Sequence, residues 1–412
     1  MSEIDPGDTA WVLTSAALVL FMTPGLAFFY GGMVRAKHVL AMLMQNFFAM
    51  GIVTVLWVAF GYSLAFGAAG NGGLIGNLDF IGLKDMAGEV SGTVPAMAFS
   101  AFQLTFAVIT PALITGAIAD RLRWPAWVGF ITLWSVLVYL PVAHWVFAGG
   151  WLADRGALDF AGGTVVHVNA GAGALALIFL LGKRRGWPNT AMPPHSLPLT
   201  LLGTGILWFG WFGFNAGSAL AANGVAAQAF MNTFVAAAAA MLGWLVVERA
   251  KSGHATTLGA ASGAVAGLVA VTPCAGFVNA MGAVTIGFLA GAVCFLAIGL
   301  KFRFGYDDAL DVIAVHLVGG ALGSVLLGLF ADAGVNDAGK DGLFLGGGWS
   351  LLGEQVLAVV AVFAFSFVVS LGIGLALKAL LPNGIRVSEE DEERGLDLTQ
   401  HSETGYSLEY VS

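Results

Sequence analysis

The stretch "DFAGGTVVHVNAGAGAL", Asp159 to Leu175, carries a histidine inside an otherwise small and apolar segment. A carboxylate opens the stretch, and the imidazole of His167 follows eight residues later. A helix rises about 1.5 Å per residue, so His167 would lie roughly 12 Å beyond Asp159. In a hydrocarbon core about 30 Å thick, that depth is close to the middle. The stretch therefore predicts a membrane-spanning helix with an ionisable side chain near its midplane.

The composition of the chain is that of an integral membrane protein. Of the 412 residues, 58% are hydrophobic and 10% are charged, whereas soluble domains carry about 25% charged residues. The apolar runs are about 20 residues or longer, which suits transmembrane helices. The alternating segments of about ten residues that build membrane β-barrels are not seen. No basic patch supports nucleic-acid binding.

Eleven apolar runs, each bounded by turn or charge clusters, predict an all-α membrane protein with eleven transmembrane helices. A transmembrane domain would occupy residues 1–381, and residues 382–412 would form a C-terminal tail. The predicted helices cover about residues 10–33, 39–66, 95–119, 124–147, 160–182, 196–218, 225–248, 256–273, 280–300, 308–330 and 350–381.

The distribution of basic residues predicts the orientation. Fourteen of the 17 Lys and Arg lie in loops after odd-numbered spans or in the tail, and only Lys84, Arg155 and Lys340 do not. Since basic loops stay in the cytoplasm, the N-terminus is expected outside and the C-terminus inside. The N-terminus "MSEIDPGD" has no basic residue, so we expect the first run to remain as a span rather than to be cleaved as a signal peptide.

A weak internal repeat relates the two halves of the chain. Asp308 precedes His316 by eight residues, as Asp159 precedes His167, and "HVNAGAGAL" resembles "HLVGGALGS". Spans 1–5 (about 10–182) and 6–10 (about 196–330) would be two copies, and five spans in each copy make the second inverted. Inverted repeats are typical of transporters and channels with a site near the midplane. Chance similarity between Gly- and Ala-rich helices is the alternative.

The repeat would bring His167 and His316 toward the midplane from opposite sides. One reading is two unrelated core histidines, each hydrogen-bonded to a neighbouring helix. The other is a functional pair, because ionisable residues at this depth usually mark a substrate or proton path. Burial disfavours the charged form, so we expect neutral imidazoles that both donate and accept hydrogen bonds. Such a lining suits a small neutral molecule or a proton and offers K⁺ or Na⁺ no ring of oxygens.

The remaining histidines and the cysteines have ordinary predicted roles. Those in loops and in the tail are expected to be solvated, and one near the outer end of span 4 is expected to pack there. The cysteines are expected to be small core residues with neither a disulfide nor a metal. The loop and tail histidines are His38, His195, His254 and His401, the packed one is His144, and the cysteines are Cys274 and Cys294.

Several long motifs resemble those of the ammonium transporter (Amt/Mep/Rh) family, in its bacterial Amt form. They are "TPGLAFFYGG", "DFAGGTVVHVNAG", "WFGFNAGSA", "DVIAVH" and the tail motif "GLDLTQHSETGY", which together span nearly the whole chain. The resemblance implies eleven helices per subunit, a homotrimer with one pore in each subunit, and a place in the prokaryotic plasma membrane. It implies no cofactor and no enzymatic activity.

The resemblance also assigns site residues. Its twin pore histidines fall on His167 and His316, and Asp159 matches an aspartate that supports the outer site without touching the ion. The stacked gate falls on Phe106 and Phe214, and the outer ammonium site falls on Phe106, Phe147 and Ser218.

Phe147 departs from the family pattern. A tryptophan usually stands twelve residues before the aspartate, where this chain has Phe147, with Trp145 and Trp151 nearby. Tryptophan is the best cation–π partner and phenylalanine is a poorer one. We therefore expect weaker ammonium recruitment at this site.

The implied function is transport of ammonium, in which NH₄⁺ is recruited outside, deprotonated, and conducted as NH₃ past the histidines. Whether the proton travels separately is left open. A first alternative is a neutral gas (NH₃/CO₂) channel of the Rh type, and a second is an ammonium sensor, although no signalling domain follows the last span. A third is a cytochrome with histidine haem ligands, which a narrow glycine-rich pore disfavours.

The tail "RVSEEDEERGLDLTQHSETGYSLEYVS" gives two conflicting signals. Its block of like charges is typical of a solvated, disordered segment. The resemblance instead implies a tail that packs under the bundle, touches a neighbouring subunit and assists a PII-type regulatory protein. Because Arg121, Arg123 and the basic run 183–185 lie on the same face, we expect an ordered tail docked on these bases.

Overall fold

The computed structural model describes residues 3–70 and 72–406, in which ten helical segments are long and apolar enough to cross a membrane. Each coincides with a predicted span, and the fourth is extended, after a break at residues 148–150, by a short helix Trp151–Arg155. These segments are Pro6–Met33, Ala36–Phe66, Ala96–Ile118, Trp124–Arg155, Gly163–Leu181, Leu197–Ala219, Gly224–Ser252, Ala280–Phe304, Ile313–Phe330 and Ser350–Leu380.

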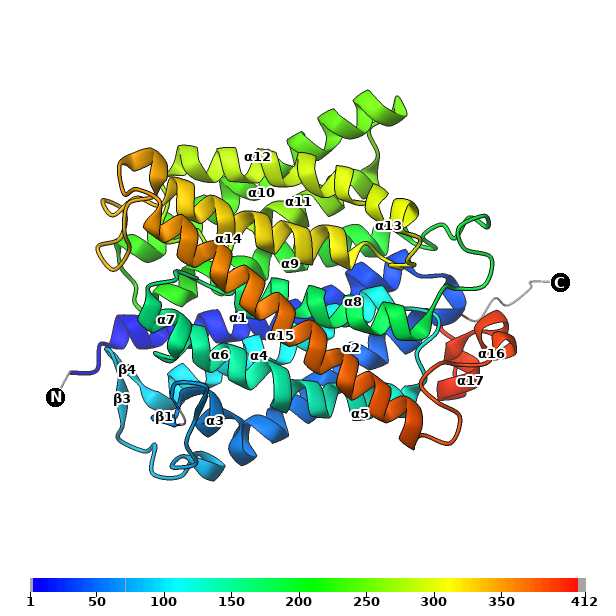
Figure 1. Cartoon of the computed structure of the whole chain (residues 1–412), viewed down its shortest axis with the longest axis horizontal. Coiled ribbons are helices and arrows are strands. Elements are labelled where there is room, and N and C mark those ends of the chain that lie inside the picture. Colours follow the sequence, from blue (N-terminus) through cyan, green and yellow to red (C-terminus); the bar gives the residue numbers. More distant parts are fainter. Residues whose placement is uncertain (1–2, 71, 407–412) are drawn as a thin grey trace.

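The segments form one bundle of nearly parallel and antiparallel helices (Figure 1). Two small antiparallel hairpins, β1 (Ala69–Gly70) with β2 (Ile75–Gly76) and β3 (Val90–Ser91) with β4 (Val94–Pro95), lie at one end, which we call the hairpin end. The α-helices are α1 (Pro6–Met33), α2 (Val39–Leu56), α3 (Tyr62–Phe66), α4 (Ala96–Ile118), α5 (Trp124–Trp134), α6 (Leu140–Phe147), α7 (Trp151–Arg155), α8 (Asn169–Leu181), α9 (Leu197–Ala216), α10 (Gly224–Ser252), α11 (Thr257–Val271), α12 (Ala280–Ala297), α13 (Gly299–Phe304), α14 (Gly319–Phe330), α15 (Ser350–Leu380), α16 (Glu389–Arg394) and α17 (Leu396–His401).

Short polar side chains begin several of these helices. Asp5, Ser196, Asn223, Thr256 and Asn279 stand just before α1, α9, α10, α11 and α12, and each side chain accepts a hydrogen bond from a backbone N–H in the first turn. These N–H groups have no partner within the helix, so capping satisfies them. The caps fix where these helices begin, and α1 begins at Pro6, four residues before the start predicted from the apolar run.

The predicted eighth span is shorter than expected. Helix α11 has 15 residues, and the chain continues in turns instead of completing the predicted run to residue 273. The turns are held by Asn232, whose Nδ2 donates to the carbonyls of Ala275 and Val278 at 2.8 and 2.7 Å. Helix α11 packs against α9, α10, α12 and α14. It is therefore an apolar helix inside the bundle that is too short to span a membrane as a regular helix.

Close packing of α1 on α9 joins the two halves of the chain. A Cβ on Gly25 would lie 2.6 Å from Ile206 Cγ2, and one on Gly213 would lie 2.9 Å from the Ser15 carbonyl oxygen. Small residues thus let the two backbones approach, as in other membrane bundles. These helices are the first spans of the two predicted repeat halves.

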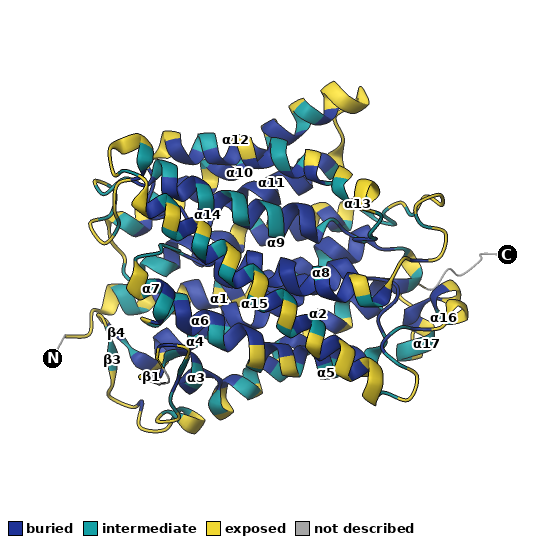
Figure 2. Ribbon diagram, in the orientation of Figure 1, coloured by how far each residue is buried: buried dark blue, intermediate teal, exposed yellow. Residues whose placement is uncertain are grey.

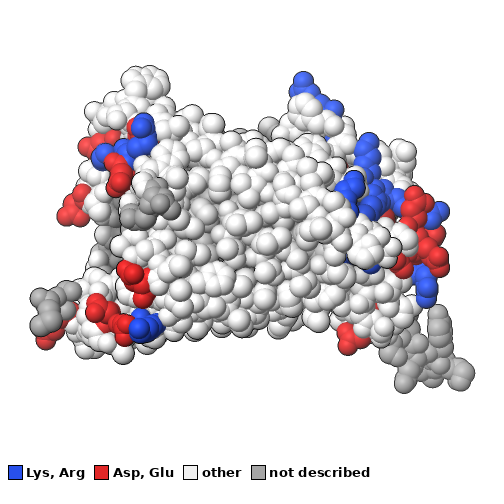
Figure 3. All heavy atoms as spheres, turned by 60° about the horizontal axis from the view of Figure 1, so that its bottom comes forward, with Lys and Arg blue, Asp and Glu red and all other residues white. Residues whose placement is uncertain are grey.

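The outer surface separates an apolar band from two charged ends. Large apolar side chains such as Phe234 and Leu242 on α10 and Val360 and Val368 on α15 are exposed, and the interior is buried (Figure 2). Charged residues gather at the ends and leave the middle of the visible face uncharged (Figure 3). Lys and Arg are most numerous at the end opposite the hairpins, which we call the tail end because α16 and α17 lie there.

The tail is ordered through residue 406 and docks on the bundle, so the prediction of disorder from composition is wrong for this part. Val387 N donates to the carbonyl of Arg121 at 3.0 Å, and Asp397 accepts from Ala41 N at 2.8 Å. Glu392 is buried and accepts from Arg185 N and from the Arg386 guanidinium. These pairings compensate the acidic charge that composition alone treats as self-repelling.

The docking contacts differ in part from the predicted ones. Arg185 does pair with the tail, through Glu393 at 2.7 Å. The guanidinium groups of Arg121 and Arg184 instead bind Asp307 inside the protein, at 2.7 and 2.9 Å. Burial of Asp307 opposes ionisation, but the hydrogen bonds from Arg184 and the charge of Arg121 hold the pKa of its carboxyl below the ordinary value. This cluster fixes the loops beneath the tail.

Three histidines predicted to be solvated are not. His38 is buried and accepts from Leu396 N at 3.2 Å. His195 is partly buried between the Val34 carbonyl and the Tyr406 hydroxyl. His401 is partly buried against Trp124, with 5.1 Å between the ring centroids. These predictions failed because the tail packs on loops that would otherwise face water. The two cysteines are fully buried core residues, as predicted.

Candidate functional site

The two midplane histidines meet in the centre of the bundle. His167 lies on the π-helical segment Gly163–Val168 before α8, and His316 lies on the π-helical segment Ile313–Val318 before α14. Their Nδ1 atoms are 3.2 Å apart, and the ring planes are inclined by 19°. Both side chains are almost completely buried. π-Helical turns are rare and frequently mark functional sites.

Two glycines allow this meeting. Gly171 and Gly320 each stand four residues after a histidine, on the same helical face. A Cβ on Gly171 would lie 2.6 Å from Leu317 Cβ, and one on Gly320 would lie 2.8 Å from His167 Cβ. Each half of the chain therefore supplies one histidine and one glycine, and the missing side chain of each glycine leaves room for the histidine segment of the other half.

Aromatic rings form a column on one side of the histidine pair. The rings of Phe106 on α4 and Phe214 on α9 are 4.3 Å apart and inclined by 35°. Phe214 and Trp211 lie beside the His167 ring, at 6.2 and 5.6 Å between centroids. All of these rings are buried. The predicted gate residues and the predicted histidines thus form one continuous stack.

A narrow cavity is lined by both histidines and by the rings of Phe214 and Trp211. The volume open to the centre of a water-sized molecule is about 10 Å³, which is about the volume that one such molecule requires. The Trp211 N–H is already donated to Thr272 at 2.9 Å, so the histidine nitrogens are the polar atoms left in the lining. The lining is completed by apolar side chains, namely Met22, Leu26, Ile109, Leu113, Val166, Leu207 and Val265.

Asp159 holds the beginning of the His167 segment. Its carboxylate accepts from the backbone N–H groups of residues 162–165, at 2.7 to 3.3 Å, and from the Thr164 hydroxyl. A carboxylate at the start of a helix is favoured by the unpaired N–H groups and by the helix dipole. The equivalent Asp308 accepts from the backbone N–H of Ile313 alone, and its second oxygen has no partner. The two halves therefore differ at this position.

The predicted outer-site residues are arranged less tightly. The Ser218 hydroxyl donates to the Phe214 carbonyl at 2.8 Å, so its oxygen lone pairs remain free to accept. Phe147 ends α6 and is partly buried, and no ring contact joins it to Phe106 or Phe214. Trp145 has other partners: its N–H donates to the Leu74 carbonyl at 2.8 Å, and its ring packs on Phe365.

Comparison with known proteins assigns the family. Residues 10–406 match the family model described as "Ammonium Transporter Family". The chain belongs to the ammonium transporter family. The resemblance found in the sequence motifs is thereby confirmed, and the family is one of transporters rather than enzymes.

Similar proteins agree with this assignment. A protein of Mycobacterium tuberculosis (strain ATCC 25618 / H37Rv) named "Ammonium transporter" is 52% identical over 445 residues, which cover 100% of this chain and 92% of that protein. One of the same name from Bacillus subtilis (strain 168) is 51% identical and covers 97% of this chain and 98% of its own. The crystal structure of Saccharomyces cerevisiae Mep2 is 36% identical with a TM-score of 0.90, covering 100% of this chain and 93% of that chain. A "Sensor Amt Protein" is 30% identical with a TM-score of 0.88, covering 96% and 98%.

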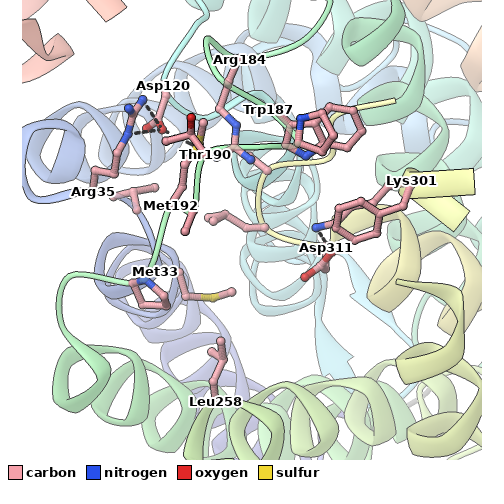
Figure 4. Close-up of a pocket in the computed structure, with 17 residues that line it drawn as sticks. Met33, Arg35, Asp120, Arg184, Trp187, Thr190, Met192, Leu258, Lys301 and Asp311 are labelled. Carbon is pink, nitrogen blue, oxygen red and sulfur yellow. Dashed lines mark hydrogen bonds and ion pairs between the residues drawn. The ribbon is translucent and has the colours of Figure 1, made fainter. Parts of the chain in front are cut away.

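A wider polar cavity of about 290 Å³ lies at the tail end of this transporter (Figure 4). Its charged side chains are paired: Arg35 Nη2 lies 2.9 Å from Asp120 Oδ2, and Lys301 Nζ lies 2.6 Å from Asp311 Oδ1. Arg184 also lines the cavity, and its guanidinium is paired with Asp307 at 2.9 Å. The cavity is therefore large and polar enough for water but has little net charge.

Two residues of the site were not singled out from the sequence. Trp211 precedes Phe214 by three residues, so the two side chains lie on the same helical face. This spacing could have identified Trp211 as a site residue from the sequence. Tyr30 on α1 places its hydroxyl 3.3 Å from His316 Nε2. The chain separation of 286 residues leaves no local signal for this contact.

The glycine contact generates a first prediction. Gly320→Ala places a methyl group 2.8 Å from His167 Cβ and 2.9 Å from the Gly163 carbonyl oxygen, so the protein should lose about 1–3 kcal/mol of stability by overpacking. The neighbouring Gly319→Ala is the control, because its methyl would meet side-chain atoms of Cys294 and Val269 at 3.3 Å. Thermal unfolding in detergent compares the two. Equal melting temperatures would contradict the proposed crossing of the segments.

A second prediction concerns Asp159. Asp159→Asn keeps one acceptor oxygen and turns an NH₂ group toward backbone donors, so about 1–3 kcal/mol of stability should be lost. The matched control Asp308→Asn disturbs one hydrogen bond and should cost less. Unfolding curves of both variants measure the difference. A larger loss in Asp308→Asn would show that Asp159 is not the main anchor of its segment.

Proposed function

We propose that this chain transports ammonium by conducting NH₃ past the Phe106–Phe214 stack and through the cavity lined by His167 and His316. The family assignment and the names of the relatives support the substrate. The observation that carries the pathway is the narrow buried cavity whose free polar atoms are histidine nitrogens. A bare cation would lose its hydration there without replacement, which is costly.

We place the hairpin end outside and the tail end in the cytoplasm of the prokaryotic plasma membrane. The gathering of Lys and Arg at the tail end supports this orientation. The bundle then has eleven spans, with the short α11 and its following turns as the eighth. The close packing of α1 on α9 and the crossing of the two histidine segments support an inverted repeat. The exposed apolar band fits lipid and the neighbouring subunits of a homotrimer.

Recruitment occurs at the hairpin end of the aromatic column. NH₄⁺ donates to the free lone pairs of Ser218 and lies against the rings of Phe106 and Phe147, which attract cations. Asp159 keeps its carboxylate bonded to five N–H and O–H donors, so it supports the site without binding the ion. NH₄⁺ transfers its proton to water at the hairpin end, and the neutral NH₃ enters the dry cavity.

Passage then requires the two rings to move apart. NH₃ passes Phe106 and Phe214, donates or accepts hydrogen bonds at His167 and His316, and emerges into the polar cavity at the tail end, where water can protonate it. A proton that follows the histidine pair would make the transport electrogenic. The docked tail and the basic face around it form the surface that we assign to a PII-type regulatory protein.

Alternative functions have weaker support. A neutral gas channel is favoured by Phe147 in place of a tryptophan, and saturable methylammonium transport would exclude it. A sensor is not favoured, because the relatives at 51–52% identity are named transporters and the sensor structure is 30% identical. Haem ligation does not fit, since the two histidine nitrogens are in hydrogen-bond contact and the cavity cannot hold a porphyrin.

The histidine pair generates a third prediction. His167→Ala and His316→Ala should each lower ammonium flux at least about tenfold, because each removes a hydrogen-bond partner of the guest in the dry cavity, and a barrier raised by about 1.4 kcal/mol lowers a rate tenfold. Flux is measured as methylammonium uptake into proteoliposomes. His254→Ala is the control, because this histidine is exposed and should transport normally. Wild-type flux in both pore variants, with K⁺ still excluded, would overturn the proposed pathway.

Phe147 generates a fourth prediction. Phe147→Trp should tighten apparent ammonium affinity by about 1 kcal/mol, close to fivefold in half-saturation concentration, because a larger π face meets the cation. Phe179→Trp is the control, since Phe179 is 56% exposed on the side of α8. Concentration-dependent uptake gives both values. An unchanged half-saturation concentration in Phe147→Trp would remove Phe147 from the recruitment site.

A further inference from the structure

A separate cavity of about 280 Å³ lies at the hairpin end, where α3, the loop 67–95 and the start of α4 meet. Four of its lining residues are aromatic, namely Tyr62, Phe66, Phe80 and Phe99. We call it the aromatic cavity. The pathway proposed for ammonium uses none of these four residues, so the aromatic cavity is a feature that transport does not explain.

The four rings form one connected wall. The Phe80 ring meets the Tyr62 ring at 5.8 Å between centroids and an inclination of 64°. The Tyr62 ring stacks beside Phe66 at 5.8 Å, and Phe66 meets Phe99 at 5.0 Å and 88°. Two of these three pairs are steeply inclined, so the ring faces point in different directions. Aromatic faces turned in several directions are the arrangement by which aromatic cages surround methylated ammonium groups.

The aromatic cavity also carries a negative charge. Of the described residues that line it, Glu89 alone is charged, and its side chain is exposed to water. The backbone of Glu89 is held in place, because its N–H donates to the Met86 carbonyl at 3.2 Å and its carbonyl accepts from Ala96 N at 2.9 Å. Lys84 is the one base in the loop 67–95, and its Nζ lies 3.7 Å from the carboxylate of Asp85.

We propose that the aromatic cavity binds a small organic cation of the methylated ammonium class. The ring faces surround the N-methyl groups, and the Glu89 carboxylate supplies the opposite charge. An anion would be repelled by this carboxylate, and a neutral guest of the same shape would lack the attraction of a cation to the rings. The volume of about 280 Å³ suits a small ligand, whereas the pore cavity of about 10 Å³ does not. The cation is therefore bound but not transported.

An occupied aromatic cavity should weaken ammonium recruitment. Ala148 also lines the aromatic cavity, and it directly follows Phe147 of the proposed recruitment site. The bound cation would place a positive charge beside that site, and like charges repel over about 8 Å at physiological ionic strength. We expect a higher half-saturation concentration for methylammonium uptake when the cation is present outside. This consequence rests on the proposed function, but the binding itself does not.

The test is titration calorimetry of the full chain in a maltoside detergent, with choline and with its neutral isostere 3,3-dimethyl-1-butanol. We expect choline to bind and the isostere to bind much more weakly. Glu89→Gln removes the charge, and Phe80→Leu removes a ring but keeps an apolar side chain. Each should weaken choline binding about two- to fivefold. Asp85→Asn is the control, because Asp85 is an exposed acid of the same loop that does not line the aromatic cavity, and it should bind choline normally.

Three results would overturn the proposal. The first is absence of choline binding, or equal binding of the neutral isostere. The second is loss of binding in Phe147→Leu with normal binding in Glu89→Gln and Phe80→Leu, which would place the cation at the recruitment site instead. The third is binding of dihexanoylphosphatidylcholine without binding of free choline, which would indicate a lipid headgroup.

Methylammonium uptake into proteoliposomes, with choline outside, tests the effect on transport. We expect choline to raise the half-saturation concentration of the unchanged chain and to raise that of Glu89→Gln less. An unchanged half-saturation concentration would overturn the effect on recruitment. Choline binding as expected, in vesicles that take up no methylammonium even without choline, would refute the proposed function and leave the cation site standing.

Discussion

The contact between two buried imidazoles is the interaction on which the rest of the structure depends. A polar nitrogen in a dry interior is costly unless it is hydrogen-bonded, and here each histidine supplies the partner of the other at 3.2 Å. They can meet only because the π-helical segments cross where Gly171 and Gly320 lack side chains. Asp159 in turn fixes the start of one segment through five donors. The pore is thus a consequence of how the two halves of the chain pack.

In this arrangement, selectivity between guests depends on the free energy each guest loses when it leaves its hydration shell to enter the cavity. On the face that Figure 3 shows, charged residues gather at the two ends, and pairs such as Arg35–Asp120 and Lys301–Asp311 lie at the tail end. The narrow cavity between the ends offers nitrogen atoms and apolar carbon but no set of oxygens to replace a hydration shell. A molecule that can shed its charge and still form hydrogen bonds is therefore favoured over one that cannot. Ammonium meets this condition because deprotonation leaves a neutral molecule with both donors and an acceptor.

Much of the fold could be predicted from the sequence, because membrane spans are signalled by long apolar runs bounded by turn and charge clusters. Ten helical segments agree with predicted spans, and the motifs identified the family. Failures occurred where the partner lies far away in the chain. Arg121 binds Asp307 across 186 positions, His38 is covered by the tail, and Tyr30 reaches His316 across 286. The composition of the tail also gave a wrong prediction of disorder, because it counts the acidic charges of the segment but not the bases elsewhere in the chain that pair with them.

The most direct test of the central claim is the response of proteoliposomes to an ammonium pulse, followed by an internal pH dye at mildly acidic pH, where NH₃ leakage through lipid is slow. Protein-free vesicles and an equal pulse of K⁺ are the controls. The account predicts a saturable change of internal pH that depends on the protein and occurs with ammonium and methylammonium but not with K⁺. A response equal to that of protein-free vesicles, or K⁺ transport at a similar rate, would contradict a dry pore that conducts ammonia past paired histidines.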